Sequence, residues 1–523
     1  MEIGIKQNSI TSDSWKASSR NVRSSLLSRL IRYLFTFIFR LIFAHCFSVA
    51  YLGTHDLLGN TIKVLAMAEL GLNSTLAYAL YKPLLAGNLA KARAILRYYQ
   101  QHFRYVASGL ALLFALAIPL YGYLVGDLRI DQPYLIYLLF ALDTVCSYCF
   151  ATRRIALDAS LQQHVDNYVT LCAFVVTNIL QFAVLIYLHS YLGYLLLKLA
   201  NTLAINIYLH LKAAKKLPAL CHKQGAIEPL TKAEHSLLKR DLIAVLWHLI
   251  GDKFILMLDT LAISWWLDVS FVGIYTNYFK LLLMASVLIS MLFNALQSTV
   301  GTLTITASAR HKFAVFCDLS LVLEWLLACT ICGFYLFCQP LVELAYGSNF
   351  LLAEGYILLL LLSFYLTTKR RVLIVFKTIH GMFYQDRLRI IPELFLRLLI
   401  ASIGGYYLGL SGIILASIIG TLALATWIEP LLLYRQVFFR SVKLYFVRYA
   451  LDLILFFVLI GLSHLVASWL PVNVNQTTIS LVCNLTLRFL FVLSIPTLLV
   501  GLSYSKTPSL FRVINLLKTR LFN

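Results

Sequence analysis

The chain has few charged residues: only 13% of its 523 positions are Asp, Glu, Lys or Arg, about half the usual share for a globular protein, roughly 25%. Hydrophobic residues make up 60%. So few charges cannot cover the surface of a water-soluble protein of this length, so we predict an integral membrane protein. Acidic residues are scarcest, 23 against 44 Lys and Arg. In a membrane protein this excess indicates loops facing an anionic leaflet rather than binding to nucleic acid.

Several chemical signatures are also missing. No glycine pattern of a nucleotide-binding loop occurs between the apolar segments, which weighs against an ATP-driven pump. No His/Cys/Asp cluster has metal-ligand spacing, and no nucleophilic serine arrangement is evident. Two CxxC spacings, Cys146/Cys149 and Cys329/Cys332, lie in apolar segments. Without polar neighbours such cysteines are expected to be small apolar filler.

What the chain has instead is a series of long apolar segments. A window of about 19 residues, the length needed to cross a bilayer, predicts an all-α polytopic protein with fourteen transmembrane helices. We place these spans near 33–53, 58–81, 105–125, 133–152, 169–188, 192–211, 242–266, 271–300, 314–338, 353–373, 391–408, 412–434, 449–468 and 479–503.

Charge placement supports this count and gives an orientation. With a cytoplasmic amino terminus, the inner segments hold 36 of the 44 basic residues and the outer loops hold one, Arg129. A missed span would invert every later loop, so both termini are predicted to be cytoplasmic. The outer loops are short, about 14 residues at most (339–352), which argues against a polymerase or transferase whose site needs a large outer domain.

The loop lengths predict two lobes of six helices. We expect a cytoplasmic tail (1–32), an N-lobe (33–211), a basic linker (212–241), a C-lobe (242–434), two appended spans (435–503) and an amphipathic cytoplasmic tail (504–523). Residues 88–104 also combine basic and apolar residues at helical spacing, and we interpret them, like the tail, as a helix lying on the inner leaflet.

Ionisable side chains inside the predicted spans are the main functional signal. Each charge at mid-bilayer costs about 2.5–3.5 kcal/mol on insertion scales, so such groups usually face a bundle interior or a wet cavity. We expect Lys63, Lys198 and Arg488 to reach the headgroups by extending along the helix. The thirteen side chains that we single out are Arg40, Lys63, Lys198, Lys253, Lys280, Arg397, Arg488, Glu69, Asp143, Asp252, Asp259, Glu324 and Asp452.

Span seven carries the clearest polar face. His248 and Asp252 are one helical turn apart, and Asp259 lies seven residues beyond Asp252, so the three share one stripe. A lipid-facing stripe of this kind would be costly. Asn277 and Lys280, near the start of span eight, also share a face.

Span two pairs Glu69 with Asn73 in the same way. Two interpretations of these faces stay open. The polar groups can tie helices together by pairing with each other, or they can line a hydrated, charged lumen between two lobes.

Several stretches resemble the bacterial polysaccharide flippases, the Wzx-type branch of the superfamily that includes the MATE exporters. "LAMAELGLNSTLAYALYKPL" (65–84) resembles the second-span signature of that family. "LDTLAIS" with "VGIYTNY" (258–278) resembles its pair across spans seven and eight. "HGMFYQDRLRIIPELFLRLLIASI" (380–403) with "WIEPLLLY" (427–434) resembles its stretch up to span twelve.

The chain departs from the family pattern in span seven. The family often has a His-Lys-Ile-Gly run, where this chain has "HLIG" at 248–251. Leu249 takes the lysine position, and Lys253, four residues on, lies on nearly the same face and is the candidate substitute. Thr260 stands where the family has Asn.

The resemblance implies a flippase that moves a polyprenyl-pyrophosphate-linked oligosaccharide from the inner to the outer leaflet, for capsule, exopolysaccharide or O-antigen assembly. It implies alternating access of two lobes about a central site. The expected cations that contact phosphate are Arg40, Lys253, Lys280 and Arg397. The residues expected to pair with them, or to carry a coupling proton or sodium ion, are Glu69, Asn73, Asp252, Asp259 and Asn277.

The alternative is a MATE-like, ion-coupled antiporter of small solutes or drugs, whose lumen would be more apolar or acidic. A polytopic polymerase or transferase is the third hypothesis. For the flippase we expect no cofactor beyond H⁺ or Na⁺, no enzymatic activity and no nucleic acid. The expected partners are the lipid-linked oligosaccharide, membrane lipids and the polysaccharide polymerase machinery, and the expected state is a monomer in the bacterial cytoplasmic membrane.

Overall fold

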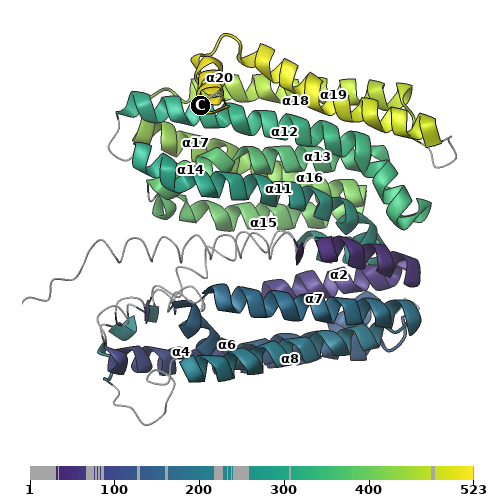
Figure 1. Ribbon diagram of the computed structural model, residues 1–523, viewed down its shortest axis with the longest axis vertical. Helices are drawn as coiled ribbons and strands as arrows, with labels where there is room; N and C mark the ends of the chain where they lie inside the picture. The colour runs from purple at the N-terminus through teal and green to yellow at the C-terminus, as the bar shows by residue number, and fades with distance from the viewer. Residues whose placement is uncertain are drawn as a thin grey trace, which may run out of the picture. The chain divides into compact units, whose positions relative to one another are not determined.

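The computed structural model describes residues 31–32, 34–65, 76, 79–80, 83, 88–125, 130–159, 163–216, 228–232, 234–236, 238–239, 258–304, 308–380, 382–472 and 478–521. In these residues all regular secondary structure is helical (Figure 1). The chain divides into two compact units, an N-terminal unit (1–261) and a C-terminal unit (262–523). The helical segment 258–266 crosses this division.

The predicted class, an all-α polytopic membrane protein, is confirmed. Among the described residues, eight helices are long and apolar enough to cross a membrane: Tyr168–Tyr187, Tyr191–Lys215, Val269–Asn294, Ala309–Tyr346, Ile391–Leu408, Leu410–Phe438, Lys443–Trp469 and Ser480–Tyr504. Shorter apolar helices cover Leu34–Cys46 and Pro133–Tyr148. Predicted spans two and seven run into residues outside the described ranges.

The N-terminal unit is a helical bundle in which α6 packs on α8 and α4, and α7 packs on α8. Its described helices are residues 34–46, α2 (Val49–Leu65), α4 (Leu89–Leu116), α5 (Ile118–Val125), α6 (Pro133–Ala159), α7 (Gln163–Tyr187) and α8 (Tyr191–Lys216).

The first turn of this unit differs from the predicted one. The first helix ends at Cys46 and α2 begins at Val49, so the break lies at Phe47 and Ser48 rather than near 54–57. Asp56, which the windowing places in a loop, is therefore inside α2 and 3% exposed. The apolar window merges helix ends across a short polar break, which is why the boundary was wrong.

Residues 88–104 do not form a separate surface helix. They are the first half of α4, which Asn88 caps by accepting a hydrogen bond from the Lys91 amide. Glu228 and Glu234, from the predicted linker, both bind the Lys91 ammonium. Hydrogen bonds from Asn88 and Lys91 lower the pKa of Glu228, so the link persists as a charged pair at neutral pH.

In the C-terminal unit, α12 is the central helix against which α11, α13, α18, α19 and α20 pack (Figure 1). The described elements are α11 (Val269–Thr304), α12 (Ala309–Tyr346), η1 (Ser348–Phe350), α13 (Glu354–Lys369), α14 (Arg371–Ile379), α15 (Phe383–Leu408), α16 (Leu410–Gly420), η2 (Thr421–Ala425), α17 (Thr426–Leu433), η3 (Tyr434–Phe438), α18 (Lys443–Trp469), α19 (Thr478–Tyr504) and α20 (Pro508–Leu521).

Close backbone contact sets the α15–α16 hairpin. A Cβ on Gly412 would lie 2.0 Å from the Gly404 carbonyl oxygen, so neither helix accepts a larger residue at the crossing. Gly409 makes the turn with φ +58, a conformation that favours glycine. The hairpin brings α15 and the start of η2 together, and with them the polar residues described below.

Arg488, which the sequence analysis expects to reach the headgroups, is buried within the protein, with 4% of its surface exposed. Its guanidinium donates to the carbonyls of Leu336, Ala467 and Leu470. Pro340 has no N–H, so the Leu336 carbonyl four residues earlier lacks its helical partner. The carbonyls at the end of α18 are likewise left open by the helix terminus. Arg488 satisfies both sets.

Replacing Arg488 with Ala removes these bonds and leaves buried carbonyls without a donor. We expect the free energy of unfolding to fall by more than about 1.5–3 kcal/mol, the usual contribution of one hydrogen bond to a charged group. Thermal unfolding of the purified protein in detergent measures this. Arg435→Ala, at an exposed arginine of the same unit, is the control. Equal stability of the two variants would contradict the assignment.

Candidate functional site

The structure describes five of the nine predicted site residues. Arg40, Asp259, Asn277 and Arg397 are buried, each at most 7% exposed, and Lys280 is half-buried. Glu69, Asn73, Asp252 and Lys253 lie outside the described residues. Asn277 and Lys280 fall on one face of α11, as predicted from their spacing.

In the N-terminal unit, Arg40 is held in a two-pronged ion pair with Asp56. The Nη2 atom of Arg40 lies 2.9 Å from Oδ2 of Asp56, and Nη1 lies 3.2 Å from Oδ1. Parallel bonds of this kind fix a guanidinium in orientation as well as in place. The sequence indicates Arg40 but misses Asp56, because the predicted loop at 54–57 removes Asp56 from the spans.

Aromatic rings from residues next to this pair, and from α8, pack against one another. The ring of Phe39 packs on His55 and Tyr194, and Phe43 packs on His55 and Tyr191, with ring centroids 5.0–6.0 Å apart. His55 Nδ1 also lies 3.0 Å from the Tyr191 hydroxyl. Such packing excludes water, so the charge on Arg40 depends on its partner more than it would at a surface.

A second ion pair in this unit joins two of the intramembrane charges singled out from the sequence. Lys198 Nζ lies 3.0 Å from Asp143 Oδ2 and 4.2 Å from the centroid of the Phe140 ring. Lys198 is therefore bound between α6 and α8, rather than extending freely to a headgroup. For this lysine the structure favours the interhelical pairing interpretation.

In the C-terminal unit, three cations share one carboxylate. Glu429 on α17 has no exposed surface, and its oxygens accept from Arg370, Lys377 and Arg389 at 2.7–3.2 Å. These donors come from the α13–α14 junction, α14 and α15, so one acidic side chain joins four segments. The sequence does not single out Glu429, because it lies near the end of a predicted span where a charge costs little.

Arg389 and Arg397 extend this arrangement along α15. Both bind Glu393, one turn from each. Arg397 also donates to the Ser417 hydroxyl at 2.8 Å and to the Thr421 hydroxyl at 2.7 Å. We call these six side chains the Glu429 cluster: Arg370, Lys377, Arg389, Glu393, Arg397 and Glu429. It has four cations and two carboxylates.

The backbone beside Arg397 is adapted to it. Thr421 starts the π-helical turn η2, a local widening that is frequent at functional sites. Gly420 precedes it, and a Cβ there would lie 2.4 Å from Arg397 Cγ. The arginine thus crosses α16 at a glycine and reaches the Ser417 hydroxyl of α16 and the Thr421 hydroxyl of the widened turn.

A second group of ion pairs in the C-terminal unit connects α12, α13 and α18. Lys369 binds both Glu324 and Asp452, and Arg448 binds Asp452 at 2.7 Å. Tyr365 donates to Glu324 at 3.1 Å. Glu324 and Asp452 were singled out as intramembrane acids, and here each carboxylate has a cationic partner. Two cations and two carboxylates make this cluster neutral.

Glu429→Gln keeps the shape of the side chain but removes the charge that its three cationic neighbours share. Because breaking a buried ion pair costs about 3–5 kcal/mol, we expect a large drop in thermal stability. Glu354→Gln is the matched control, since Glu354 pairs with His464 where both side chains are more than half exposed. Equal effects of the two substitutions on the unfolding temperature would contradict this account.

Gly420→Ala places a methyl group in the space that the Arg397 side chain occupies, so the two would overlap. We expect the arginine to leave Ser417 and Thr421, so that the protein becomes less stable and any activity that depends on the Glu429 cluster falls. Gly461→Ala on α18 is the control, because a Cβ at Gly461 has nothing within 4 Å. Thermal unfolding and transport by both variants test this. A Gly420→Ala protein as stable as Gly461→Ala would show that the close approach is unimportant.

Comparison with solved structures places the fold. A lipid II flippase, MurJ, in an inward closed conformation matches 92% of this chain and 99% of its own, with a TM-score of 0.64 and 12% sequence identity. An inward-facing multidrug resistance MATE family transporter of the MOP superfamily matches 75% of this chain and 93% of its own, with a TM-score of 0.59 and 13% identity. The Vibrio cholerae MATE transporter VcmN matches 82% of this chain and all of its own, with a TM-score of 0.53 and 13% identity.

No protein-family model and no curated protein sequence matches the chain. At identities this low the structural likeness establishes the fold alone. The chain therefore has the MATE-like fold that transporters of the MOP superfamily and a lipid flippase share.

Proposed function

We propose that the chain is a flippase for a polyprenyl-pyrophosphate-linked oligosaccharide, moving it from the inner to the outer leaflet by ion-coupled alternating access for capsule, exopolysaccharide or O-antigen assembly. The observation that carries this proposal is the excess of cations over carboxylates in the Glu429 cluster, within a MATE-like fold. Guanidinium groups bind phosphate oxygens through paired hydrogen bonds, and low exposure strengthens that attraction.

The extent of the structural matches supports a flippase. The alignments with the two MATE structures include 93% and 100% of the MATE chains but only 75% and 82% of this chain. The lipid II flippase matches 92% of this chain. The present chain thus extends beyond the part that it shares with the MATE transporters, and most of that extra length has a counterpart in the flippase structure.

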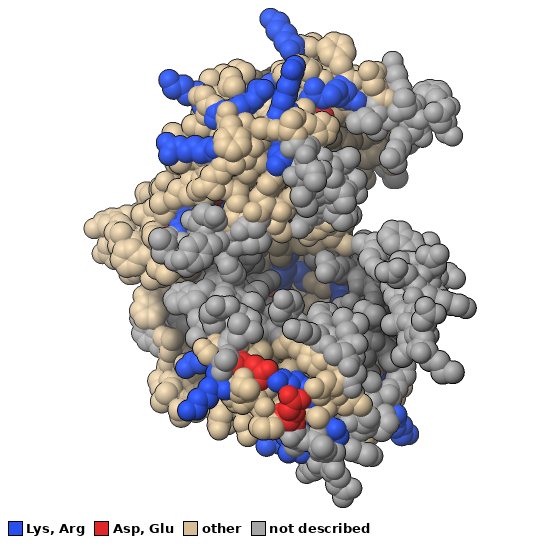
Figure 2. Space-filling view, turned by 90° about the vertical axis from the view of Figure 1, so that its left-hand side faces the viewer, with Lys and Arg blue, Asp and Glu red and all other residues tan. Residues whose placement is uncertain are grey.

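The distribution of exposed charge supports the proposed orientation. Lys and Arg side chains gather on one face of the C-terminal unit (Figure 2). Exposed basic residues mark the end of this unit where α12 and α18 begin and α19 ends: Arg310, Arg435, Arg440, Lys443 and Lys506. By the positive-inside rule we propose that this end faces the cytoplasm, in keeping with the proposal that both termini lie inside and that the membrane is the bacterial cytoplasmic membrane.

We assign a proposed role to each predicted site residue, using the environment where the structure describes it. Arg40 and Arg397 are tied to carboxylates, so we assign them to shaping the positive field rather than to direct transfer of the headgroup. Lys280, half-buried on α11 one turn from Asn277, is the candidate for direct phosphate contact. Glu69, Asn73, Asp252 and Asp259 remain the candidates for ion coupling, and Lys253 remains a candidate cation.

A MATE-like antiporter of small solutes or drugs is the second candidate, because two of the similar structures are MATE transporters. It would carry cations more readily than phosphates, and the four cations of the Glu429 cluster would oppose them. A polymerase or transferase is the least favoured, since the solved structures of similar fold are transporters and a flippase.

Reconstituted protein should translocate a fluorescent polyprenyl-pyrophosphate oligosaccharide, detected by loss of protection from an impermeant quencher. We expect Lys280→Met, which keeps the length of the side chain but not its charge, to lower the rate at least tenfold. Lys443→Met removes an exposed lysine and should leave the rate unchanged. Full transport by Lys280→Met would contradict the proposed phosphate contact, and export of a cationic dye without lipid transport would favour the antiporter.

A further inference from the structure

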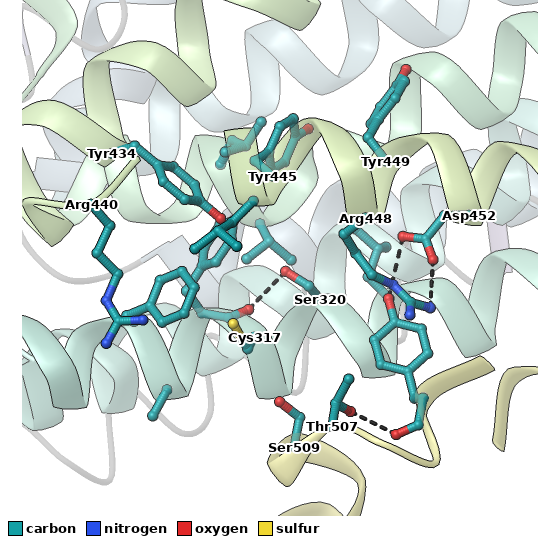
Figure 3. Close-up of a pocket in the computed structure, with 18 of the residues that line it drawn as sticks. Cys317, Ser320, Tyr434, Arg440, Tyr445, Arg448, Tyr449, Asp452, Thr507 and Ser509 are labelled. Carbon is teal, nitrogen blue, oxygen red and sulfur yellow. Dashed lines mark hydrogen bonds and ion pairs between the residues drawn. The ribbon is translucent and has the colours of Figure 1, made fainter. Parts of the chain in front are cut away.

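The C-terminal unit contains a pocket whose lining includes none of the site residues predicted from the sequence. It has a volume of about 500 Å³, within the range of about 300–1,000 Å³ that is typical of ligand sites. Its walls come from α12, the α13–α14 junction, η3, α18 and the segment that leads from α19 into α20 (Figure 3).

One part of the pocket is strongly basic. Five cationic side chains line it: Arg310, Lys369, Arg440, Arg448 and Arg512. Three of them are neutralised. Lys369 and Arg448 bind Glu324 and Asp452, and Arg512 binds Asp318. Their charges are therefore balanced by carboxylates of the protein itself.

Arg310 and Arg440 are different, because both are exposed and neither has an ion pair within the described residues. The Arg440 guanidinium carbon lies 4.4 Å from the centroid of the Phe313 ring. Contact with an aromatic face leaves the N–H groups of a guanidinium available to an anion. Two positive charges thus stand at the pocket without a carboxylate.

The lining also contains one carboxylate, Asp452, which is paired with Lys369 and Arg448. The rest of the lining is mainly apolar and hydroxylic. Hydrocarbon surface comes from Phe313, Phe316, Val372 and Leu373. Hydroxyl groups come from Ser320, Thr507 and Ser509. Figure 3 shows Arg440 and Tyr434 on one side of the cavity and Thr507 and Ser509 below it. A ligand that fits this lining combines an anionic group with a hydrocarbon part.

Helix α20 closes one wall of the pocket. The Arg512 guanidinium makes bonds of 2.7–3.1 Å to both oxygens of Asp318 on α12. Leu510 and Val513 pack against the buried core formed by α12, α18 and α19. Helix α20 is therefore held in place by both an ion pair and apolar contacts, and it forms a fixed wall of the pocket.

We propose that this pocket binds an anionic glycerophospholipid of the surrounding bilayer, with its phosphate at Arg310 and Arg440 and the first part of an acyl chain along the apolar wall. Charge complementarity and the position at the basic end of the unit carry the choice of ligand, since in the proposed orientation that end meets the anionic cytoplasmic leaflet. The proposal concerns a site within one unit and does not depend on the transported substrate.

The test uses the full-length protein in a nonionic detergent, titrated with phosphatidylglycerol and followed by native mass spectrometry and thermal shift. We expect Arg310→Ala/Arg440→Ala to weaken apparent binding at least tenfold. Arg435→Ala/Lys443→Ala removes two exposed charges from the same end, neither of which lines the pocket, and should bind as the unmodified protein does. Equal loss in both double variants, or in neither, overturns the proposal.

Two further arms identify the source of the anion. Inorganic phosphate and phosphatidylcholine at matched concentrations should give no saturable shift; if phosphate alone does, the ligand is a free anion and the lipid assignment is wrong. Cys317 lines the pocket, whereas Cys172 is exposed in the other unit. Phosphatidylglycerol should slow alkylation of Cys317 and not of Cys172. Unchanged alkylation of Cys317 at saturating lipid counts against occupancy of the pocket.

Discussion

The structure depends on neutralising charge inside apolar helices, and Glu429 is where this constraint is strongest. An isolated carboxylate there would be too costly to bury, and so would any of its three cationic neighbours. Together they are tolerated because each supplies the counter-charge that the others lack. The α13–α14 junction, α14, α15 and α17 are thus linked through one side chain. The net positive charge that remains is the basis of the proposed function.

The sequence predicts the fold class, an all-α polytopic membrane protein, because hydropathy is a property of long segments. An error of several residues at a helix end does not change it. The individual pairings are harder, since they depend on details shorter than the window. Arg40 was identified as a buried cation, but its partner Asp56 was missed because a two-residue break at Phe47 and Ser48 leaves too little polarity to shift a 19-residue average.

The same limit explains the Glu429 cluster and Arg488. Arg397 stands in the middle of an apolar run and is conspicuous, whereas Glu393 and Glu429 lie near span ends, where a charge is ordinary. Arg488 was expected to reach the headgroups by extending along its helix. Its hydrogen-bond partners are backbone carbonyls. The sequence does not show which carbonyls lack a donor because of a proline or a helix end. The MATE-like fold, in turn, does not determine a substrate; the charges placed on it do.

The contact between Arg488 and the Leu336 carbonyl, which joins residues 152 positions apart, has an evolutionary consequence. The arginine is useful because Pro340 exists, and the proline is tolerable because the arginine exists. A lineage that lost the proline first would restore the helical hydrogen bond to the Leu336 carbonyl, and Arg488 would keep its bonds to Ala467 and Leu470. A lineage that lost the arginine first would carry a defect until the proline followed. Loss of the proline is therefore the less costly first step, because it leaves no buried carbonyl without a donor.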